Sequence, residues 1–151
     1  MKKYAILSVT DKKNLEKLGE ELLKNGFTIF SSGGTKKYLE KYNIEVHSVS
    51  ELTGFPEILD GRVKTLHPKV FGGILGDHSS ESHLSQMQEN KINKIELVVV
   101  NFYNFDEGKG KSFSEAIESI DIGGPSMVRA AAKNHTNCLV VTDPEDYDEV
   151  I

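Results

Sequence analysis

The chain has 151 residues, of which 18 are basic and 23 acidic, giving a formal net charge of −5, and 38% of its residues are hydrophobic. These values are ordinary for a single soluble domain, and the negative charge disfavours binding to nucleic acid or to an anionic membrane surface. No apolar run approaches the ~18 residues of a membrane-spanning helix, and Met1 does not begin an apolar signal segment.

The first part of the chain predicts a strand, a helix and a second strand. The run YAILSV, from Tyr4 to Val9, is typical of a buried strand. A helix should follow, with Asp11 as its N-cap and Gly26 just beyond its C-terminus. Its apolar positions fall on one face: Leu15, Leu18, Leu22 and Leu23. FTIFS, which begins at Phe27, predicts the next strand.

The remaining elements continue this alternation. Thr35 can cap a short helix, IEVHSV from Ile44 predicts a third strand, and the polar stretch 77–91 predicts a surface helix. ELVVVNFY from Glu96 predicts the central strand, and a second helical region and the strand CLVVT follow it. Alternating strands and helices favour parallel pairing, so we expect an α/β fold. It should be a three-layer sandwich with a mainly parallel sheet and a site at the carboxyl ends of the strands.

Neither a disulfide nor a metal site is expected. Cys138 is the single cysteine and lies in the apolar run CLVV, which favours a buried structural thiol over a nucleophile and fits a reducing cytoplasm. The histidines form neither an HExxH pair nor a group with the cysteine: His47, His67, His78, His83 and His135. The sequence also lacks a dinucleotide fingerprint, so no cofactor is expected.

A glycine loop follows the predicted strand FTIFS. In SSGGT, from Ser31 to Thr35, the backbone N–H groups of Gly33 and Gly34 can point at a phosphate near the positive end of the next helix. Lys12, in SVTDK after the first strand, can add a point charge at the neighbouring strand end. Each motif also has a purely structural explanation, because glycines permit a turn and SVTDK can provide a helix cap and a solvated lysine.

The segment DGRVKTLHPK, from Asp60 to Lys69, concentrates basic groups in an acidic chain. These are Arg62, Lys64, His67 and Lys69. They alternate with apolar Val63 and Leu66, so half of the segment should be packed while its basic side chains face an anion. The alternative is a surface turn whose charges are solvated.

The stretch IDIGGPSMVRAAAKNH predicts a helix that begins at a Gly-Gly-Pro turn, with Pro125 at the first helical position. Arg129 and Lys133 should share one face, and four residues should face the sheet: Met127, Val128, Ala131 and Ala132. Asp121 lies just before the helix. Contact with Lys133 would make either an acid/base pair or an ordinary salt bridge.

Tyr103 ends the central strand in VNFY, where its phenol and the Asn101 amide could reach the site. A core or rim aromatic is the alternative for Tyr103.

Five motifs together resemble the inosine monophosphate (IMP) cyclohydrolase domain of the bifunctional purine biosynthesis enzyme, which has a methylglyoxal synthase-like, Rossmann-like fold. They occur in the family's order and cover most of the chain from Tyr4 to Asp146: SVTDK, SSGGT, TGFPEILDGRVKTLHPKVFGGIL, VVVNFY and IDIGGPSMVRAAAKNH. The resemblance implies a cytoplasmic homodimer. It would convert 5-formamidoimidazole-4-carboxamide ribonucleotide to IMP and water without a cofactor. Residues 1–151 would form this domain, truncated at its C-terminus and without the family's transformylase domain.

The same resemblance assigns the site residues motif by motif. The phosphate and ribose would be held by Thr10, Asp11, Lys12, Ser32, Gly33, Gly34 and Thr35. The base end would be lined by Arg62, Val63, Lys64, Thr65, Asn101 and Ile122. The catalytic positions of the family match Lys64, Tyr103, Asp121 and Lys133, with Lys133 in proton transfer. Tyr103 is followed by Asn104, where the family usually has proline.

Two other functions fit parts of the sequence. A non-catalytic nucleotide- or phosphate-sensing module of the same fold accounts for the glycine loop, but it gives no reason for the four catalytic matches to occur together. Phosphate elimination of the methylglyoxal synthase type lacks a matching catalytic carboxylate in the family's context.

Overall fold

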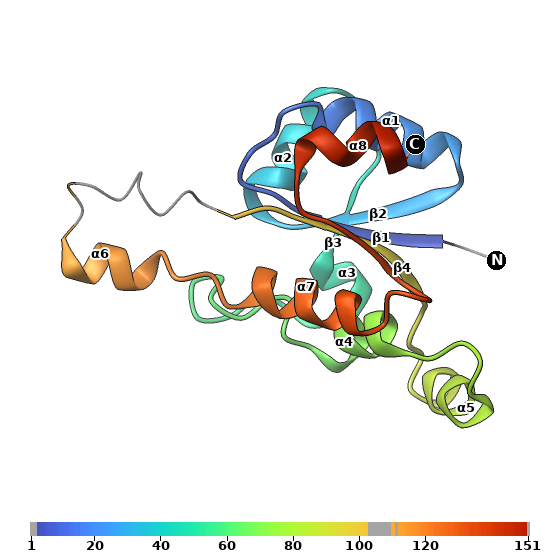
Figure 1. Ribbon diagram of the computed structural model, residues 1–151. Coiled ribbons are helices and arrows are strands. Elements are labelled where there is room, and N and C mark those ends of the chain that lie inside the picture. Colours follow the sequence, from blue (N-terminus) through green and yellow to red (C-terminus); the bar gives the residue numbers. More distant parts are fainter. Residues whose placement is uncertain (1–2, 103–109, 111, 151) are drawn as a thin grey trace.

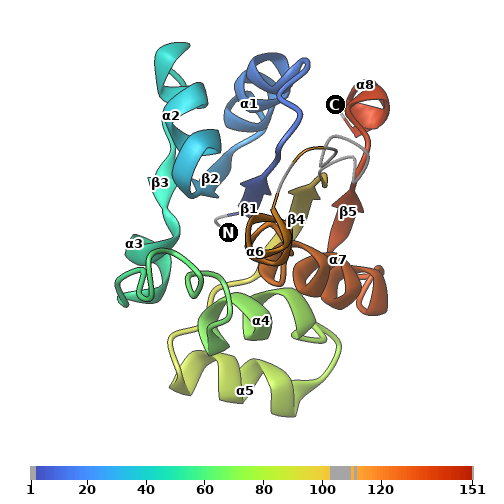
Figure 2. The ribbon, with the colours of Figure 1, turned by 90° about the vertical axis from the view of Figure 1, so that its left-hand side faces the viewer.

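A computed structural model, described at residues 3–102, 110 and 112–150, contains one parallel sheet between two layers of helices (Figures 1 and 2). The strand order is β3-β2-β1-β4-β5, and all four strand pairs are parallel. The strands are β1 (Lys3–Ser8), β2 (Phe27–Ser31), β3 (His47–Ser48), β4 (Ile95–Val100) and β5 (Leu139–Val141). The predicted α/β sandwich is therefore confirmed.

The helices divide between the two faces of the sheet. One face carries α1 (Leu15–Lys24), α2 (Gly33–Lys41) and α8 (Tyr147–Val150), which follows the short 3₁₀ helix η2 (Pro144–Asp146). The other carries α3 (Val49–Thr53), α4 (Pro68–Leu75) and α7 (Gly123–Lys133), and α5 (Glu81–Glu89) lies beyond α4, away from the sheet (Figure 2). Helix α6 (Phe113–Glu118) projects from the body, beside the carboxyl ends of the strands (Figure 1). Within the described residues, no helix is long and apolar enough to cross a membrane.

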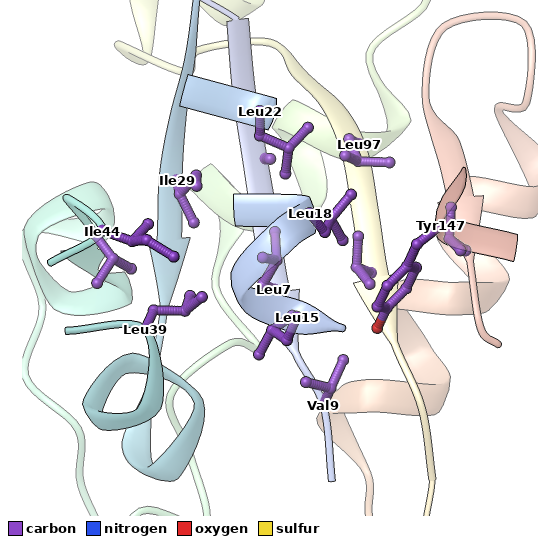
Figure 3. Close-up of a cluster of buried hydrophobic side chains, with 14 residues drawn as sticks. Leu7, Val9, Leu15, Leu18, Leu22, Ile29, Leu39, Ile44, Leu97 and Tyr147 are labelled. Atoms are coloured by element: carbon purple, nitrogen blue, oxygen red, sulfur yellow. The ribbon is translucent and has the colours of Figure 1, made fainter. Parts of the chain in front are cut away.

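The central strands are buried on both faces, and their alternation creates two cores. In β1, Ala5 and Leu7 belong to the cluster beneath α1, whereas Ile6 belongs to the cluster on the opposite face. Figure 3 shows the first cluster, in which leucines of α1 lie over the sheet and Tyr147 of α8 closes one side. In β4, a register shift opposite Tyr4 and Ala5 places Ile95 on the second face although Leu97 points to the first.

Local hydrogen bonds correct three predicted boundaries. Asn14, not Asp11, occupies the N-cap position of α1, and Asp11 Oδ1 instead accepts from the backbone N–H of Lys13 at 2.9 Å. Helix α2 begins at Gly33, so Thr35 lies inside it rather than capping it. The third strand is only two residues long because a capping box between Ser48 and Glu51 starts α3 at once.

The start of α7 also differs from the prediction. Pro125 occupies its third position, because the helix begins at Gly123. Ala130 is buried together with Met127 and Ala131, while Ala132 is exposed. Cys138 is buried as predicted, and burial raises the pKa of its thiol to about 12.

Candidate functional site

Two adjoining cavities lie beyond the carboxyl ends of β1 and β2. The glycine-loop cavity, of about 380 Å³, is lined by residues after these strands, among them Lys12, Ser32 and Gly33. The α7 cavity, of about 280 Å³, lies between the basic segment and the start of α7. Ser8, Lys64 and Asp121 line both cavities. The two cavities therefore form one site around a hydroxyl, an ammonium group and a carboxylate.

The glycine-loop cavity has the features of an anion site. It lies at the N-terminus of α2, whose first N–H groups have no partner within the helix and whose first turn contains no acidic residue. Gly33 has a φ of 55°, which favours glycine, and a Cβ added at Gly33 or Gly34 would meet no atom within 4 Å. Lys12 Nζ donates to the backbone oxygens of Val9 and Thr10 at 3.3 and 3.2 Å, beside this opening. Charge and free backbone donors thus meet at one place.

Two buried side chains fix the residues that follow β1. The Thr35 hydroxyl donates to Val9 O at 3.0 Å and accepts from Val9 N at 3.1 Å. From the other side, Asn101 Oδ1 accepts from Thr10 N at 2.6 Å and from Asp11 N at 2.9 Å. Asn101 Nδ2 donates to Asp11 O at 2.9 Å. Segments after β1, β2 and β4 are therefore bonded together at the edge of the site.

A turn of unusual backbone conformation positions the basic segment. Leu59 and Asp60 both have a φ of 54°, and Gly61 has a φ of 83°. An antiparallel bridge between Ile58 and Val63 closes this turn, with N···O distances of 3.1 and 3.3 Å. Non-glycine residues rarely adopt such left-handed conformations, and they concentrate at functional sites.

The residues after this turn contribute to the α7 cavity, but their burial differs from the prediction. Thr65 is buried, Val63 and Lys64 are half-buried, and Leu66 is 43% exposed. Arg62 Nε lies 3.2 Å from Glu118 Oε1 of α6, and both side chains line the cavity. The expectation that Leu66 is packed was therefore wrong.

Asp121 is held at the N-terminus of α7. Its Oδ1 accepts from the backbone N–H of Gly124 at 3.0 Å. Both glycines lie close to neighbouring side chains: a Cβ would lie 2.3 Å from Thr65 Oγ1 at Gly123, and 2.3 Å from Asp121 Oδ2 at Gly124. The Gly-Gly pair therefore brings Asp121 and Thr65 against the start of the helix.

The structure does not bring Asp121 and Lys133 together. They lie at opposite ends of α7, whose 11 residues correspond to about 16 Å at about 1.5 Å per residue. Lys133 is exposed and lines neither cavity. The predicted pair is therefore wrong within one copy of the chain. Tyr103 lies outside the described residues, so its position stays a prediction.

The other site residues from the sequence divide by location. The glycine-loop cavity is lined by Thr10, Lys12, Ser32, Gly33, Gly34 and Thr35. The α7 cavity is lined by Arg62, Thr65 and Ile122. Neither cavity is lined by Asp11, Val63 or Asn101.

Ser8 begins the SVTDK motif, which the sequence places at the end of the first strand beside the glycine loop, and it lines both cavities. Sequence reasoning missed other lining residues. Ile117, Glu118 and Met127 carried no comparable signal. Among the described residues, no group of three or more His, Cys, Asp or Glu side chains is placed to hold a metal ion.

Comparisons with known proteins agree with this architecture. Residues 14–126 match the MGS-like domain family. The chain is 51% identical over 154 residues to the bifunctional purine biosynthesis protein PurH of Bacillus thuringiensis subsp. konkukian (strain 97-27) and to that of Bacillus cereus (strain B4264). These alignments include 100% of this chain but 30% of each relative. The crystal structure of ForH superposes with a TM-score of 0.87 and 38% identity, covering 99% of this chain and 78% of that one.

Proposed function

The chain belongs to the MGS-like domain family, and on that basis we propose that it is an IMP cyclohydrolase of purine biosynthesis. It would close the purine ring of 5-formamidoimidazole-4-carboxamide ribonucleotide, giving IMP and water. The observation that carries this proposal is the position of Lys64 and Asp121, which line both the glycine-loop cavity and the α7 cavity. A nucleotide needs such a site, with an anion-binding end joined to a second compartment for the base.

The glycine-loop cavity would take the substrate's phosphate. Backbone N–H groups at the start of α2 would donate to the phosphate oxygens, and Lys12 would supply a positive charge. The base would then extend toward Lys64, Asp121 and the α7 cavity. This direction places the reacting groups beside the two charged side chains shared by both cavities.

The reaction requires that the substrate be held in a folded conformation and that protons be transferred. The attacking carboxamide nitrogen and the formyl carbon belong to one molecule, so holding the substrate in a folded conformation supplies proximity. The new N–C bond forms as the formyl oxygen gains negative charge, which the Lys64 ammonium would stabilise. Asp121 would take the proton lost by the attacking nitrogen. The formyl oxygen then leaves as water, with the proton held by Asp121 and the proton of the formamide N–H, and the C=N bond that forms at this nitrogen makes the ring aromatic.

Lys133 has no part in this single-chain mechanism, because it lies at the far end of α7. The family resemblance also supports a cytoplasmic location and a homodimer. Sedimentation of the purified chain would test the homodimer.

A ring-closure assay tests the proposal, following the absorbance change as the purine forms. We expect Lys64→Ala and Asp121→Asn each to lower turnover by about 10²-fold or more, the usual contribution of one acid/base or oxyanion group. IMP should still bind measurably to both variants. Arg129→Ala is the matched control, because Arg129 is an exposed cation of α7 that lines neither cavity. Wild-type turnover in the Lys64 or Asp121 variant would remove that residue from the mechanism.

A nucleotide- or phosphate-sensing module is the second candidate. The observation in its favour is that the backbone donors and Lys12 of the glycine-loop cavity can bind phosphate without any reaction. The same experiment separates the two functions. Calorimetric binding of IMP by a wild-type chain that closes no ring would favour sensing and overturn the cyclohydrolase proposal.

A further inference from the structure

The segment that follows β1, Val9 to Lys12, is fixed by side chains from two other parts of the chain. Thr35 bonds both the N–H and the oxygen of Val9, and Asn101 bonds the N–H groups of Thr10 and Asp11 together with Asp11 O. Every one of these bonds ends on backbone. The backbone of this strand-end segment is therefore held from both sides before any ligand arrives.

These bonds leave Thr35 with no side-chain donor for a phosphate. A hydroxyl has one hydrogen, and that of Thr35 goes to Val9 O at 3.0 Å. The remaining lone pair of this hydroxyl can only accept a hydrogen bond, so it cannot bind an anionic phosphate, whose oxygens need donors. Thr35 is 4% exposed. Its side chain touches the glycine-loop cavity but is committed to the segment after β1.

Asn101 is committed in the same way. It is 8% exposed and lines neither cavity. Its carbonyl oxygen accepts two bonds, which occupies both lone pairs, and its NH2 group donates one of its two hydrogens to Asp11 O at 2.9 Å. Because the side chain is buried and lines neither cavity, its hydrogen bonds hold backbone rather than contact a base.

We propose that Thr35 and Asn101 are positioning residues, which form a two-sided clamp on the strand-end segment so that Thr10 and Lys12 are already in place for the phosphate. The identity of the ligand rests on the proposed function, whereas the clamp itself does not. A loop that must become ordered on binding lowers affinity by the entropy it loses, and a clamped loop avoids that cost.

Amide hydrogen exchange of the ligand-free chain tests the clamp directly. Thr35→Val, which keeps the side-chain shape and removes the hydroxyl, should speed exchange at Val9. Asn101→Leu should speed exchange at Thr10 and Asp11. We expect about a tenfold increase at each amide, the change that corresponds to one net hydrogen bond. Thr35→Ser keeps both bonding functions of the hydroxyl and should retain slow exchange at Val9.

Ser31→Ala is the matched control. The buried Ser31 hydroxyl also bonds the backbone of β1, donating to Leu7 O at 2.7 Å, but it does so within the sheet. Its loss should leave exchange at residues 9–11 unchanged. Faster exchange at these amides in Ser31→Ala as well would indicate general loosening and would overturn a specific clamp.

Ligand binding supplies the second measurement. Thr35→Val and Asn101→Leu should weaken IMP binding about tenfold and leave inosine binding unchanged, and turnover at saturating substrate should change less than KM. Weaker IMP binding with wild-type exchange would make either residue a direct ligand and overturn the proposal. If Thr35→Val or Asn101→Leu does not fold, alanine at the same position, which also removes the hydrogen-bonding groups of that side chain, replaces it, and unchanged exchange at Val9, or at Thr10 and Asp11, would also overturn the clamp. If the wild-type chain binds no IMP, the proposed function fails. Amide hydrogen exchange of the ligand-free chain then tests the clamp without a ligand.

Discussion

Replacing Gly124 by alanine should displace the Asp121 carboxylate without removing it. The new Cβ would lie 2.3 Å from Asp121 Oδ2 and 3.1 Å from both Asp121 Cγ and Val100 Cγ1. Contacts under 3.0 Å are essentially never seen for a real Cβ, so the oxygen must retreat by at least 0.7 Å. Val100 belongs to a packed strand and limits how far the helix can move away instead. The side chain of Asp121, which is exposed, is therefore expected to move.

The size of the effect follows from this displacement. A misplacement of about 1 Å in a reacting group costs about 10²-fold in rate. Stability should change little, because alanine in a helix is favoured over glycine by about 1 kcal/mol and overpacking costs about 1–3 kcal/mol. Gly124→Ala should thus lower ring-closure turnover about 10²-fold while the melting temperature changes by only a few degrees.

A double variant makes the reasoning refutable. Gly124→Ala combined with Asp121→Asn should be no slower than Asp121→Asn alone, because both changes disable the same carboxylate. Gly19→Ala is the control, since its Cβ would approach the buried side chains of Ile44 and Leu39 no closer than 3.1 Å, in a helix away from the site. Wild-type turnover in Gly124→Ala would show that the position of the Asp121 carboxylate does not matter. Losses that multiply in the double variant would show that Gly124→Ala does not act through that carboxylate.

Three further predictions concern stability. Tyr147 Oη is buried without a partner among the described residues, and burial raises the pKa of Tyr147 to about 12. Tyr147→Phe should therefore keep or raise the melting temperature, and a drop of several degrees would contradict this. Burial lowers the pKa of His78, so the unfolded chain takes up a proton first as the pH falls through about 6.5. The stability that neutral His78 contributes is complete above that pH and is lost below it. The free energy of unfolding, measured with urea, should therefore decline less between pH 7.5 and 5.5 in His78→Asn than in the wild-type chain. Gly73→Ala would place a Cβ 2.6 Å from Asn93 O and 2.8 Å from Ile95 Cδ1, and should cost about 1–3 kcal/mol in the free energy of unfolding; an unchanged urea midpoint would refute this.

The order of the elements was predictable because buried parallel strands are continuous apolar runs, as in YAILSV and ELVVV. The length of the third strand was not deduced, although Ser48 and Glu51 carry the spacing of a capping box. Leu66 illustrates a different failure. Alternation with basic residues indicated packing, but the turn at Leu59 to Gly61 determines which side chains face inward, and such a turn is not visible in hydrophobic pattern.

The candidate site was predictable to the level of motifs. Carboxyl ends of parallel strands meet at one edge, which is why Lys12 and the glycine loop share a cavity. Asp121 and Lys133 were expected to pair because Asp121 lies just before the helix that carries Lys133, yet the 11 residues of α7 separate them. The roles of Thr35 and Asn101 depend on which neighbour takes each donor, and only the tertiary arrangement determines that.

The bonds around the segment after β1 also link the site to folding. The bond between Val9 and Thr35 joins residues 26 apart in sequence, and that between Thr10 and Asn101 joins residues 91 apart. Contacts of such range form only when β1, β2 and β4 have assembled, and folds rich in them fold slowly. A nucleotide that binds at this edge therefore recognises the native chain alone. At a concentration of 100 times its Kd it would raise the free energy of unfolding by about 2.7 kcal/mol, so a thermal shift could rank candidate ligands without any enzymatic assay.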